Sequence, residues 1–151
     1  MTAWLCILNR ANFDVVKKTH VWGVSERHKN QPAKSKIGEK CAFYILPERS
    51  LGERKASIGG VFEIISDPYF DDSQLFGPHR DPEERFPYRV KIKPIKIYQP
   101  ELPFSDLVPL LKFITNKPNY GSHLLGKAMR QIPEEDLDLI IKKGSKIKIK
   151  R

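Results

Sequence analysis

The fold of this chain is decided by residues 41–46, which read Cys-Ala-Phe-Tyr-Ile-Leu and form a short run of apolar and aromatic side chains. Such a run is typical of a buried β-strand, and the turn-like residues 36–40 lead the chain into it. Residues 4–8, Trp-Leu-Cys-Ile-Leu, predict a buried strand as well. A third strand is predicted over residues 57–65, where two adjacent glycines at 59–60 indicate a bulge or a close backbone approach. The first part of the chain is therefore predicted to be rich in β-structure.

Three helices are predicted from capping residues and charge. Asn12 is expected to cap a short helix over residues 13–19. Ser105 predicts a helix over residues 106–113 that contains a proline, which is tolerated only in the first turn. Residues 133–144 begin with Pro-Glu-Glu-Asp and end with Lys-Lys-Gly, so their end charges suit a helix dipole.

The remaining segments are a further strand and three connections. Residues 89–97 alternate cations and aliphatic side chains, which predicts a strand with one wet face, at an edge or bulged at Pro94. Residues 25–36 are expected to form a loop or a broken helical turn, and residues 47–55 a charged, hairpin-like connection. The connection over residues 66–87 is too long for a neutral turn and is therefore expected to be functional or mobile.

Length and composition predict one domain, because 151 residues with 40% hydrophobic side chains suffice for one substantial core. We expect this domain to span residues 1–143 and a basic tail to follow over residues 144–151. Cys6 and Cys41 lack the spacing of a zinc site, so we expect free thiols, no metal, no cofactor and a cytoplasmic location. The chain has no apolar run near the ~18 residues that span a bilayer, and it enters structure too early for a signal peptide. A monomer or weak homodimer without a membrane partner is expected.

The formal charge of +9 suggests a polyanionic partner, although six of the positive charges lie in the last ten residues and leave only +3 elsewhere. Residues 17–55 carry ten Lys and Arg against four Glu. Residues 67–85 carry six acids against two arginines. The basic part of the domain therefore surrounds residues 20–24.

Residues 20–24, His-Val-Trp-Gly-Val, place a large flat aromatic beside a glycine in a segment rich in cations and amides. This combination suits a flat, partly polar ligand such as a nucleobase. Trp22 is expected to stack on the base, a contact worth about 1–3 kcal/mol. The alternative is that Trp22 closes the end of the core as a packing residue.

Polar and charged residues around this segment are candidates for reading a base edge or holding phosphates. The candidate ligand-binding residues are Asn9, Arg10, Trp22, Ser25, Lys29, Asn30, Phe70 and His123. The candidate phosphate contacts are Arg27, Arg89, Lys91 and Lys93. Three of these residues have structural alternatives: Asn9 can cap a turn, Phe70, like Phe76, can anchor its loop, and His123 can cap a helix.

Several motifs occur in a definite order along the chain. They are Trp4-Leu5-Cys6-Ile7, Val21-Trp22-Gly23-Val24, Gly38-Glu39-Lys40 before Phe43-Tyr44, Ile58-Gly59-Gly60, Pro68-Tyr69, Pro87-Tyr88-Arg89-Val90, and residues 124–130 before Pro133. This set, which covers residues 3–143, resembles the EVE domain family and in particular its archaeal members. The resemblance implies an α+β, PUA-like fold, a curved mixed β-barrel flanked by short helices. The chain departs from the family pattern at Ser25-Glu26, where relatives commonly carry Arg-Asn.

The resemblance implies a nucleic-acid-binding module, because EVE domains are similar to YTH domains, which hold a methylated adenine of RNA in an aromatic cage. It places Trp22 where YTH domains have a cage tryptophan, and Asn9 and Arg10 where they have polar pocket residues. The expected ligand is a modified or flipped-out base of RNA or DNA. Two alternatives stay open: a general PUA-like RNA-binding or ribonucleoprotein assembly module that uses the basic strand and tail, and a small-molecule sensor with the same pocket.

No enzymatic activity is expected. His79, Arg80 and Asp81 are adjacent in an acidic loop, but no partnered nucleophile is evident in the sequence. Cys41 falls in an apolar run where a thiol is inert. The sequence also contains no glycine-rich phosphate loop.

Overall fold

The computed structural model describes residues 1–47, 55–77 and 81–148, with side chains as far as Gly144. The predicted connection over residues 47–55 falls almost wholly outside the described residues, as do His79 and Arg80. Within the described ranges, no helix combines the length and the apolar character needed to cross a membrane.

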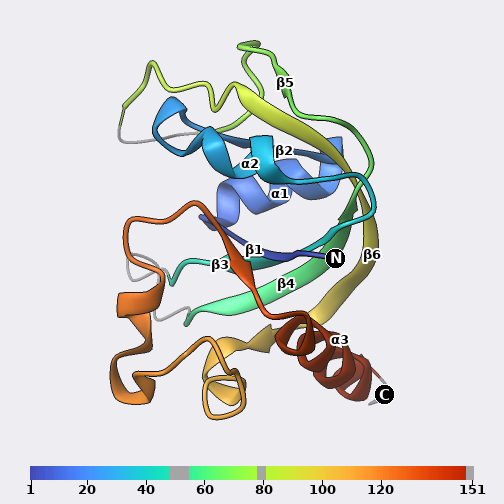
Figure 1. Cartoon of the computed structure of the whole chain (residues 1–151), viewed down its shortest axis with the longest axis vertical. Helices are drawn as coiled ribbons and strands as arrows, with labels where there is room; N and C mark the ends of the chain where they lie inside the picture. The colour runs from blue at the N-terminus through green and yellow to red at the C-terminus, as the bar shows by residue number, and fades with distance from the viewer. Residues whose placement is uncertain (48–54, 78–80, 149–151) are drawn as a thin grey trace.

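One strongly curved sheet forms the body of the molecule (Figure 1). Its strands are β1 (Ala3–Leu8), β2 (Val21–Val24), β3 (Lys40–Ile45), β4 (Ser57–Ile64), β5 (Tyr69–Phe70), β6 (Tyr88–Pro103) and β7 (Met129–Ile132). They pair in the order β2-β6-β4-β3-β1-β7, and the short β5 also pairs with β6. Strands β1 and β3 are parallel and the other pairs are antiparallel, so the sheet is mixed. This curled half-barrel confirms the predicted α+β, PUA-like fold.

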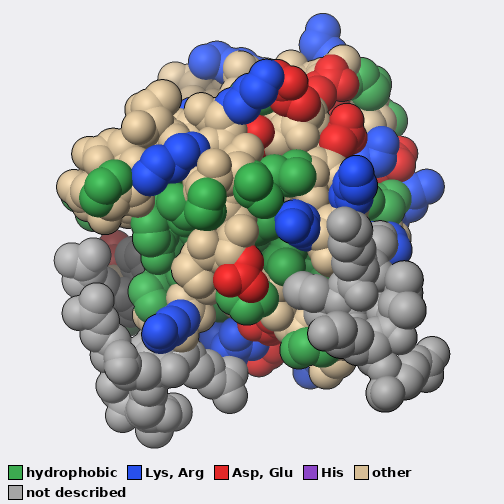
Figure 2. Space-filling model, turned by 90° about the horizontal axis from the view of Figure 1, so that it is seen from below, with side chains coloured by type: hydrophobic (Ala, Val, Ile, Leu, Met, Phe, Trp, Pro, Cys, Tyr) green, Lys and Arg blue, Asp and Glu red, His purple; other side chains and the backbone are tan. Residues whose placement is uncertain are grey.

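Helices cover the sheet at several places. The α-helices are α1 (Arg10–Thr19), α2 (Asn30–Lys34) and α3 (Glu134–Lys148), and the 3-10 helices are η1 (Glu26–His28), η2 (Phe104–Asp106) and η3 (Lys117–His123). Helix α3 packs against β6, and α1 contacts β2 and β3 (Figure 1). Figure 2 shows the molecule from below, where basic side chains lie among acidic and hydrophobic ones.

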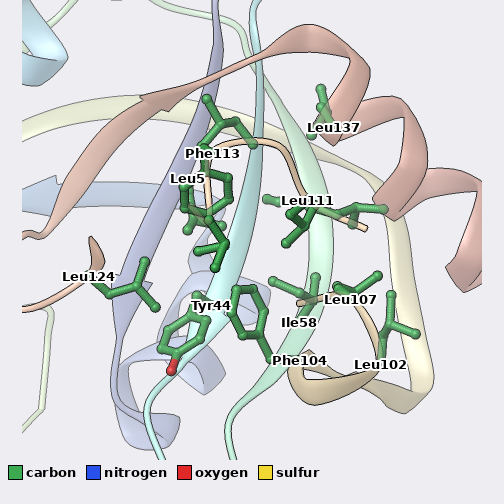
Figure 3. Packing of buried hydrophobic residues seen from close by; sticks show 14 of the residues in the cluster. Leu5, Tyr44, Ile58, Leu102, Phe104, Leu107, Leu111, Phe113, Leu124 and Leu137 are labelled. Atoms are coloured by element: carbon green, nitrogen blue, oxygen red, sulfur yellow. The ribbon is translucent and has the colours of Figure 1, made fainter. Parts of the chain in front are cut away.

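Strand β1 is buried on both faces, because its alternating side chains enter two different hydrophobic clusters. Leu5 enters a cluster built with α3 and the segment after β6. Figure 3 shows Leu5 and Tyr44 in this cluster together with Phe104. The neighbouring Trp4 enters the second cluster, inside the curl of the sheet. The apolar run predicted as a buried strand is thus confirmed.

The adjacent glycines of β4 mark a bulge, as predicted. The register of β4 shifts between Ile58 and Gly60 against both β3 and β6. A Cβ at Gly59 would collide with the ring of Phe13, so the ring packs directly on the strand backbone. Helix α1 is held against the sheet by this contact.

Helix α1 begins earlier than predicted, because Asn9 and not Asn12 is its N-cap. Asn9 has an extended backbone, and its Oδ1 accepts a hydrogen bond from the backbone N–H of Asn12 at 2.8 Å. The side chain of Asn12 instead accepts from the N–H of Gly77 at 2.8 Å, which joins α1 to the connection before β6. Residues 25–36 form η1 and α2, the broken helical turns that were one of the two predicted forms.

Strand β6 is longer than predicted and is bulged at Pro94. Val61 pairs with Lys96, whereas the next residue, Phe62, pairs with Pro94, so an extra residue of β6 lies between them. Strand β2 pairs with β6 only over Tyr88–Lys91, so within the described ranges no strand pairs with Pro94 on the side away from β4. Pro94 is therefore both bulged and at an open edge of β6, and the two predicted explanations hold together.

The predicted helix over residues 106–113 is wrong. After η2 the chain forms turns, because Pro109 has no N–H for a continuing helix. The buried carboxylate of Asp136 accepts from the backbone N–H groups of Lys112 and Phe113, each at 2.9 Å, so tertiary bonds replace helical ones. Helix α3 begins as predicted but continues through Gly144 to Lys148, and it thus includes the start of the predicted tail.

Candidate ligand-binding cleft

A cleft of about 930 Å³ opens at the carboxyl ends of the parallel strands β1 and β3. Its walls also include the start of α1, the junction of β2 and η1, the connection before β6, and residues 121–128. Clefts of this size hold small molecules or single nucleotides. Segments far apart in the sequence thus meet at one concave site.

Trp22 forms part of the wall of this cleft and part of the core at the same time. Its side chain is only 4% exposed, and its ring meets the ring of Phe43 edge-on at 5.4 Å between centroids. The buried indole Nε1 has no hydrogen-bond partner within the described part of the chain. An unsatisfied buried donor costs about 1–3 kcal/mol, so this N–H is an unpaired polar group in a residue that lines the cleft.

Gly23 allows the connection before β6 to lie close to Trp22. A Cβ at Gly23 would come within 2.5 Å of the carbonyl oxygen of Phe86 and 3.2 Å of the ring of Phe76. Both phenylalanines line the cleft, and their rings meet edge-on at 5.7 Å between centroids. The Trp-Gly pair therefore brings three aromatic side chains into one wall.

Arg89 holds this aromatic wall in place and is not available to a phosphate. Its side chain is 1% exposed, and its Nε donates to the carbonyl oxygen of Phe86 at 3.0 Å. The Nη2 atom donates to the carbonyl oxygens of Ser73 and Arg85, at 2.7 and 2.9 Å, and Nη1 donates to the Ser73 hydroxyl at 3.1 Å. The expectation that Arg89 contacts a phosphate is thus corrected, because its guanidinium already donates to backbone carbonyl oxygens. The alternation pattern of residues 89–97 gave no sign of this.

The charged residues of the cleft are of both signs. Arg27, His28 and Lys127 supply the basic groups, and Glu26, Asp81 and Glu84 supply the acidic ones. The pKa of His28 lies below its ordinary value of 6.5, chiefly because of burial and further because Arg27 and Lys127 repel the protonated form. Within the described ranges, no group of three or more His, Cys, Asp or Glu side chains is arranged to hold a metal ion.

Four of the residues predicted for the site lie together in the cleft. They are Asn9, Trp22, Ser25 and Arg27. The side-chain oxygen of Asn9 accepts the hydrogen bond that caps α1, so the capping alternative is confirmed for that atom. The structure thus places the predicted tryptophan and its polar neighbours around one cavity.

Three other predicted residues are engaged elsewhere. Arg10 pairs with Glu101, its Nη1 lying 2.8 Å from Oε2, in a hollow formed by α1 and β6. Lys29 lies 4.0 Å from Glu26 and 5.8 Å from the centroid of the Tyr88 ring. Phe70 is 61% exposed and meets the same Tyr88 ring edge-on, outside the wall of the cleft.

The remaining predicted residues do not line the cleft. His123 accepts a hydrogen bond at its Nε2 from the backbone N–H of Asn116 at 3.1 Å, so it caps a turn. Asn30 is exposed at the start of α2. Lys91 and Lys93 are exposed on β6, away from the lining of the cleft.

Sequence reasoning missed the contribution of residues 124–130 to the cleft. Gly126 and Lys127 line it, and Met129 pairs with Cys6 in the register of β7 on β1. The motif at 124–130 was visible in the sequence, but only the pairing of β7 with β1 brings it beside the cleft. His28 was likewise overlooked between the two cations that were named.

A family model described as the EVE domain matches residues 2–143 of this chain. The chain belongs to the EVE domain family. Two curated relatives support this assignment at high identity. The UPF0310 protein PH1033 of Pyrococcus horikoshii is 49% identical over 146 residues, covering 94% of this chain and 98% of the relative. The UPF0310 protein PYRAB08750 of Pyrococcus abyssi is 50% identical over 141 residues, covering 93% and 97%.

Solved structures share the fold of this EVE domain at low identity. The human THYN1 protein, solved in complex with DNA containing 5-methylcytosine, is similar with a TM-score of 0.63 and 16% identity, covering 95% of this chain and 98% of that one. The YTH domain of mmi1, solved in an RNA complex, is similar with a TM-score of 0.63 and 13% identity, covering 95% and 80%. These structures establish the shared fold, and they agree with the predicted relation to YTH domains.

Proposed function

We propose that this EVE domain binds nucleic acid and takes one modified base into the cleft. The observation that carries the proposal is Trp22, a residue of the cleft wall whose buried indole N–H has no partner within the described part of the chain. The edge of a base carries ring-nitrogen and carbonyl acceptors that can satisfy such a donor. Trp22 then acts as a hydrogen-bond donor in the floor of the site, and not as an open stacking surface.

The other side chains of the cleft suit a flat ligand with polar edges. Phe76 and Phe86 offer apolar contact for a ring or an added methyl group. Ser25 and Tyr44 offer hydroxyl groups. Burial raises the pKa of Tyr44 to about 12, so its hydroxyl stays protonated and can both donate and accept.

The structural relatives support a nucleic acid as the source of this ligand. THYN1 was solved with methylated DNA and the mmi1 YTH domain with RNA. We therefore propose RNA or modified DNA as the partner, and binding without catalysis as the activity.

The test is a binding panel of short single-stranded RNA and DNA, with about nine nucleotides and one central modified base. The panel contains 5-methylcytosine, N6-methyladenine and the unmodified bases. We expect a preference for one modified base, and Trp22→Phe is expected to lower the affinity for that base about tenfold, since one hydrogen bond of about 1–1.5 kcal/mol is lost. Equal affinity of the unaltered protein for every oligonucleotide would overturn the proposal.

Tyr98→Phe is a matched control for this substitution. It removes an aromatic donor, the Tyr98 hydroxyl that lies 3.3 Å from the carbonyl oxygen of Ile140, at a buried position outside the cleft. We expect this variant to keep the affinity for the preferred base. Thermal unfolding of both variants separates a loss of binding from a loss of the fold.

A further inference from the structure

A second hollow continues from the cleft on the side of α2 and β7. It has a volume of about 480 Å³, and the two hollows share His28, Gly126 and Lys127. Because they share lining residues, a polymer with one unit in the cleft can extend into this hollow. We call it the basic groove, for the residues described next.

The charged side chains that line the basic groove are all basic. Lys34, Lys127 and Arg130 line it together with His28, and none of its described lining residues is acidic. Lys34 and Lys127 are exposed, and neither forms an ion pair within the described part of the chain. Their charges are therefore available to an anion.

Arg130 is fixed at the edge of the same groove. Its Nη1 donates to the carbonyl oxygen of His123 at 3.1 Å, and its guanidinium lies 4.6 Å from the centroid of the Phe113 ring. A fixed cation loses little conformational freedom when an anion arrives. The groove thus combines one oriented cation with two exposed lysines.

A different part of the cleft wall carries the reverse charge. There a third hollow, of about 260 Å³, is lined by five acids and one arginine: Glu26, Asp72, Asp81, Glu83, Glu84 and Arg85. Glu26, Asp81 and Glu84 also line the cleft. A polyanion that leaves the cleft on this side meets repulsion, whereas the basic groove attracts it.

We propose that the basic groove holds the phosphates on one side of the recognised base, so that the arm of the strand on that side follows the groove. This inference rests on the proposed function and adds a path and a polarity to it. Lys34 and Lys127 contact the phosphates of that arm, and the acidic hollow repels the other arm, which gains no phosphate contacts there. Phosphate contacts of this kind set position and affinity without reading sequence.

The first experiment measures salt dependence with the oligonucleotide that the panel above identifies as the tightest. Each phosphate contact to a single strand contributes about −0.7 to the slope of log affinity against log salt. Lys34→Ala/Lys127→Ala is expected to reduce the slope by about 1.4 while the ratio of modified to unmodified affinity is kept. Lys91→Ala/Lys93→Ala, which removes two exposed lysines outside the groove, is the matched control and is expected to leave the slope unchanged.

The second experiment tests direction. Two oligonucleotides carry the recognised base at one end, with the extra nucleotides on its 3′ side in one and on its 5′ side in the other. One of the two is expected to bind more tightly than the free modified nucleoside, and the Lys34→Ala/Lys127→Ala variant is expected to abolish that gain. Binding of the free nucleoside itself is expected to be the same in both proteins, because it carries no phosphate.

The outcomes separate the two proposals. Equal gains from both extensions, or an equal slope in the groove variant and the unaltered protein, would overturn the path proposed here and leave the base site standing. A reduced slope without any base preference would support the groove and refute the base site. A loss of slope confined to Lys91→Ala/Lys93→Ala would overturn the groove in favour of the β6 surface.

Discussion

The Nε of Arg89 donates a hydrogen bond to the carbonyl oxygen of Phe86 at 3.0 Å, and Phe86 has a φ of +50°. A left-handed backbone is unfavourable for an aromatic residue, so surrounding bonds must hold it. Arg89 supplies such bonds from a fully buried position and so couples strand β6 to the aromatic wall of the cleft. The shape of the cleft therefore depends on Arg89, a buried cation that the sequence pattern had indicated as a phosphate contact.

Arg89→Lys tests this coupling. A lysine keeps the charge but cannot reproduce the planar set of donors to three backbone carbonyls. We expect the free energy of unfolding to fall by about 3 kcal/mol and ligand binding to fall with it. Chemical denaturation measures the first quantity, and the exposed Lys93→Ala is the control, with a change within about 0.5 kcal/mol. An unchanged stability of Arg89→Lys would show that the wall does not depend on this side chain.

Gly23→Ala tests the close approach beside Trp22. The new methyl group would lie 2.5 Å from the Phe86 carbonyl oxygen, so the wall must move. We expect a loss of about 1–3 kcal/mol in stability and a weaker ligand affinity. Gly121→Ala is the matched control, because Gly121 also lines the cleft yet has nothing within 4 Å of its added Cβ. Equal behaviour of the two alanine variants would argue against a tight wall.

The elements of this fold that the sequence predicts correctly are those that depend on a few residues close together in the chain. The apolar run at residues 41–46, the glycine pair at 59–60 and the acidic start of α3 each specify their structure through a few neighbouring residues. The failed helix over residues 106–113 shows the limit, because Asp136 captures its N–H groups from another element. Such tertiary bonds leave no local signature.

The residues of the candidate site likewise fall into those that a local pattern predicts and those that only the tertiary structure brings together. Trp22 was predicted as a site residue because an aromatic beside a glycine is a local feature, and the structure places it in the cleft wall. Arg89 was misassigned because its burial depends on Ser73, 16 residues earlier in the chain, as well as on the nearby carbonyl groups of Arg85 and Phe86. Lys34 and Lys127 line one groove only because α2 contacts β7, which begins two residues after Lys127, so this groove cannot be seen in the sequence.

The ionised Glu101 is expected to account for part of the stability that the protein loses in acid. Its pKa lies below the ordinary value of 4.5, first because Arg10 donates hydrogen bonds to the carboxylate and then because Ser57 does. A lowered pKa means that the unfolded chain binds this proton first, so the stabilisation is present above about pH 4.5 and is lost as the pH falls through the folded value. Glu101→Gln is expected to show a shallower loss of stability below about pH 4.5, measured by denaturation at several pH values. A profile that runs parallel to that of the unaltered protein would contradict this assignment.

The lowered pKa of His28 leads to a prediction of how nucleic-acid binding depends on pH. In the free protein its pKa is below 6.5, because burial and then the charges of Arg27 and Lys127 disfavour the protonated imidazole. Lys34 and Arg130, which line the same groove, add positive charge, while Glu26 contributes a carboxylate on the cleft side. A phosphate in the groove reverses this balance and raises the pKa of His28, so binding takes up a proton.

Affinity for the oligonucleotide is therefore expected to rise several-fold as the pH falls from about 7 to about 5.5, because the bound state holds more protons in this range. His28→Gln keeps a hydrogen-bonding side chain but cannot titrate, so its affinity is expected to be flat over the same interval. Fluorescence anisotropy at constant ionic strength measures both profiles, and the free nucleoside serves as the ligand without phosphate. A pH dependence that persists in His28→Gln, or that appears equally with the nucleoside, would place the titrating group elsewhere.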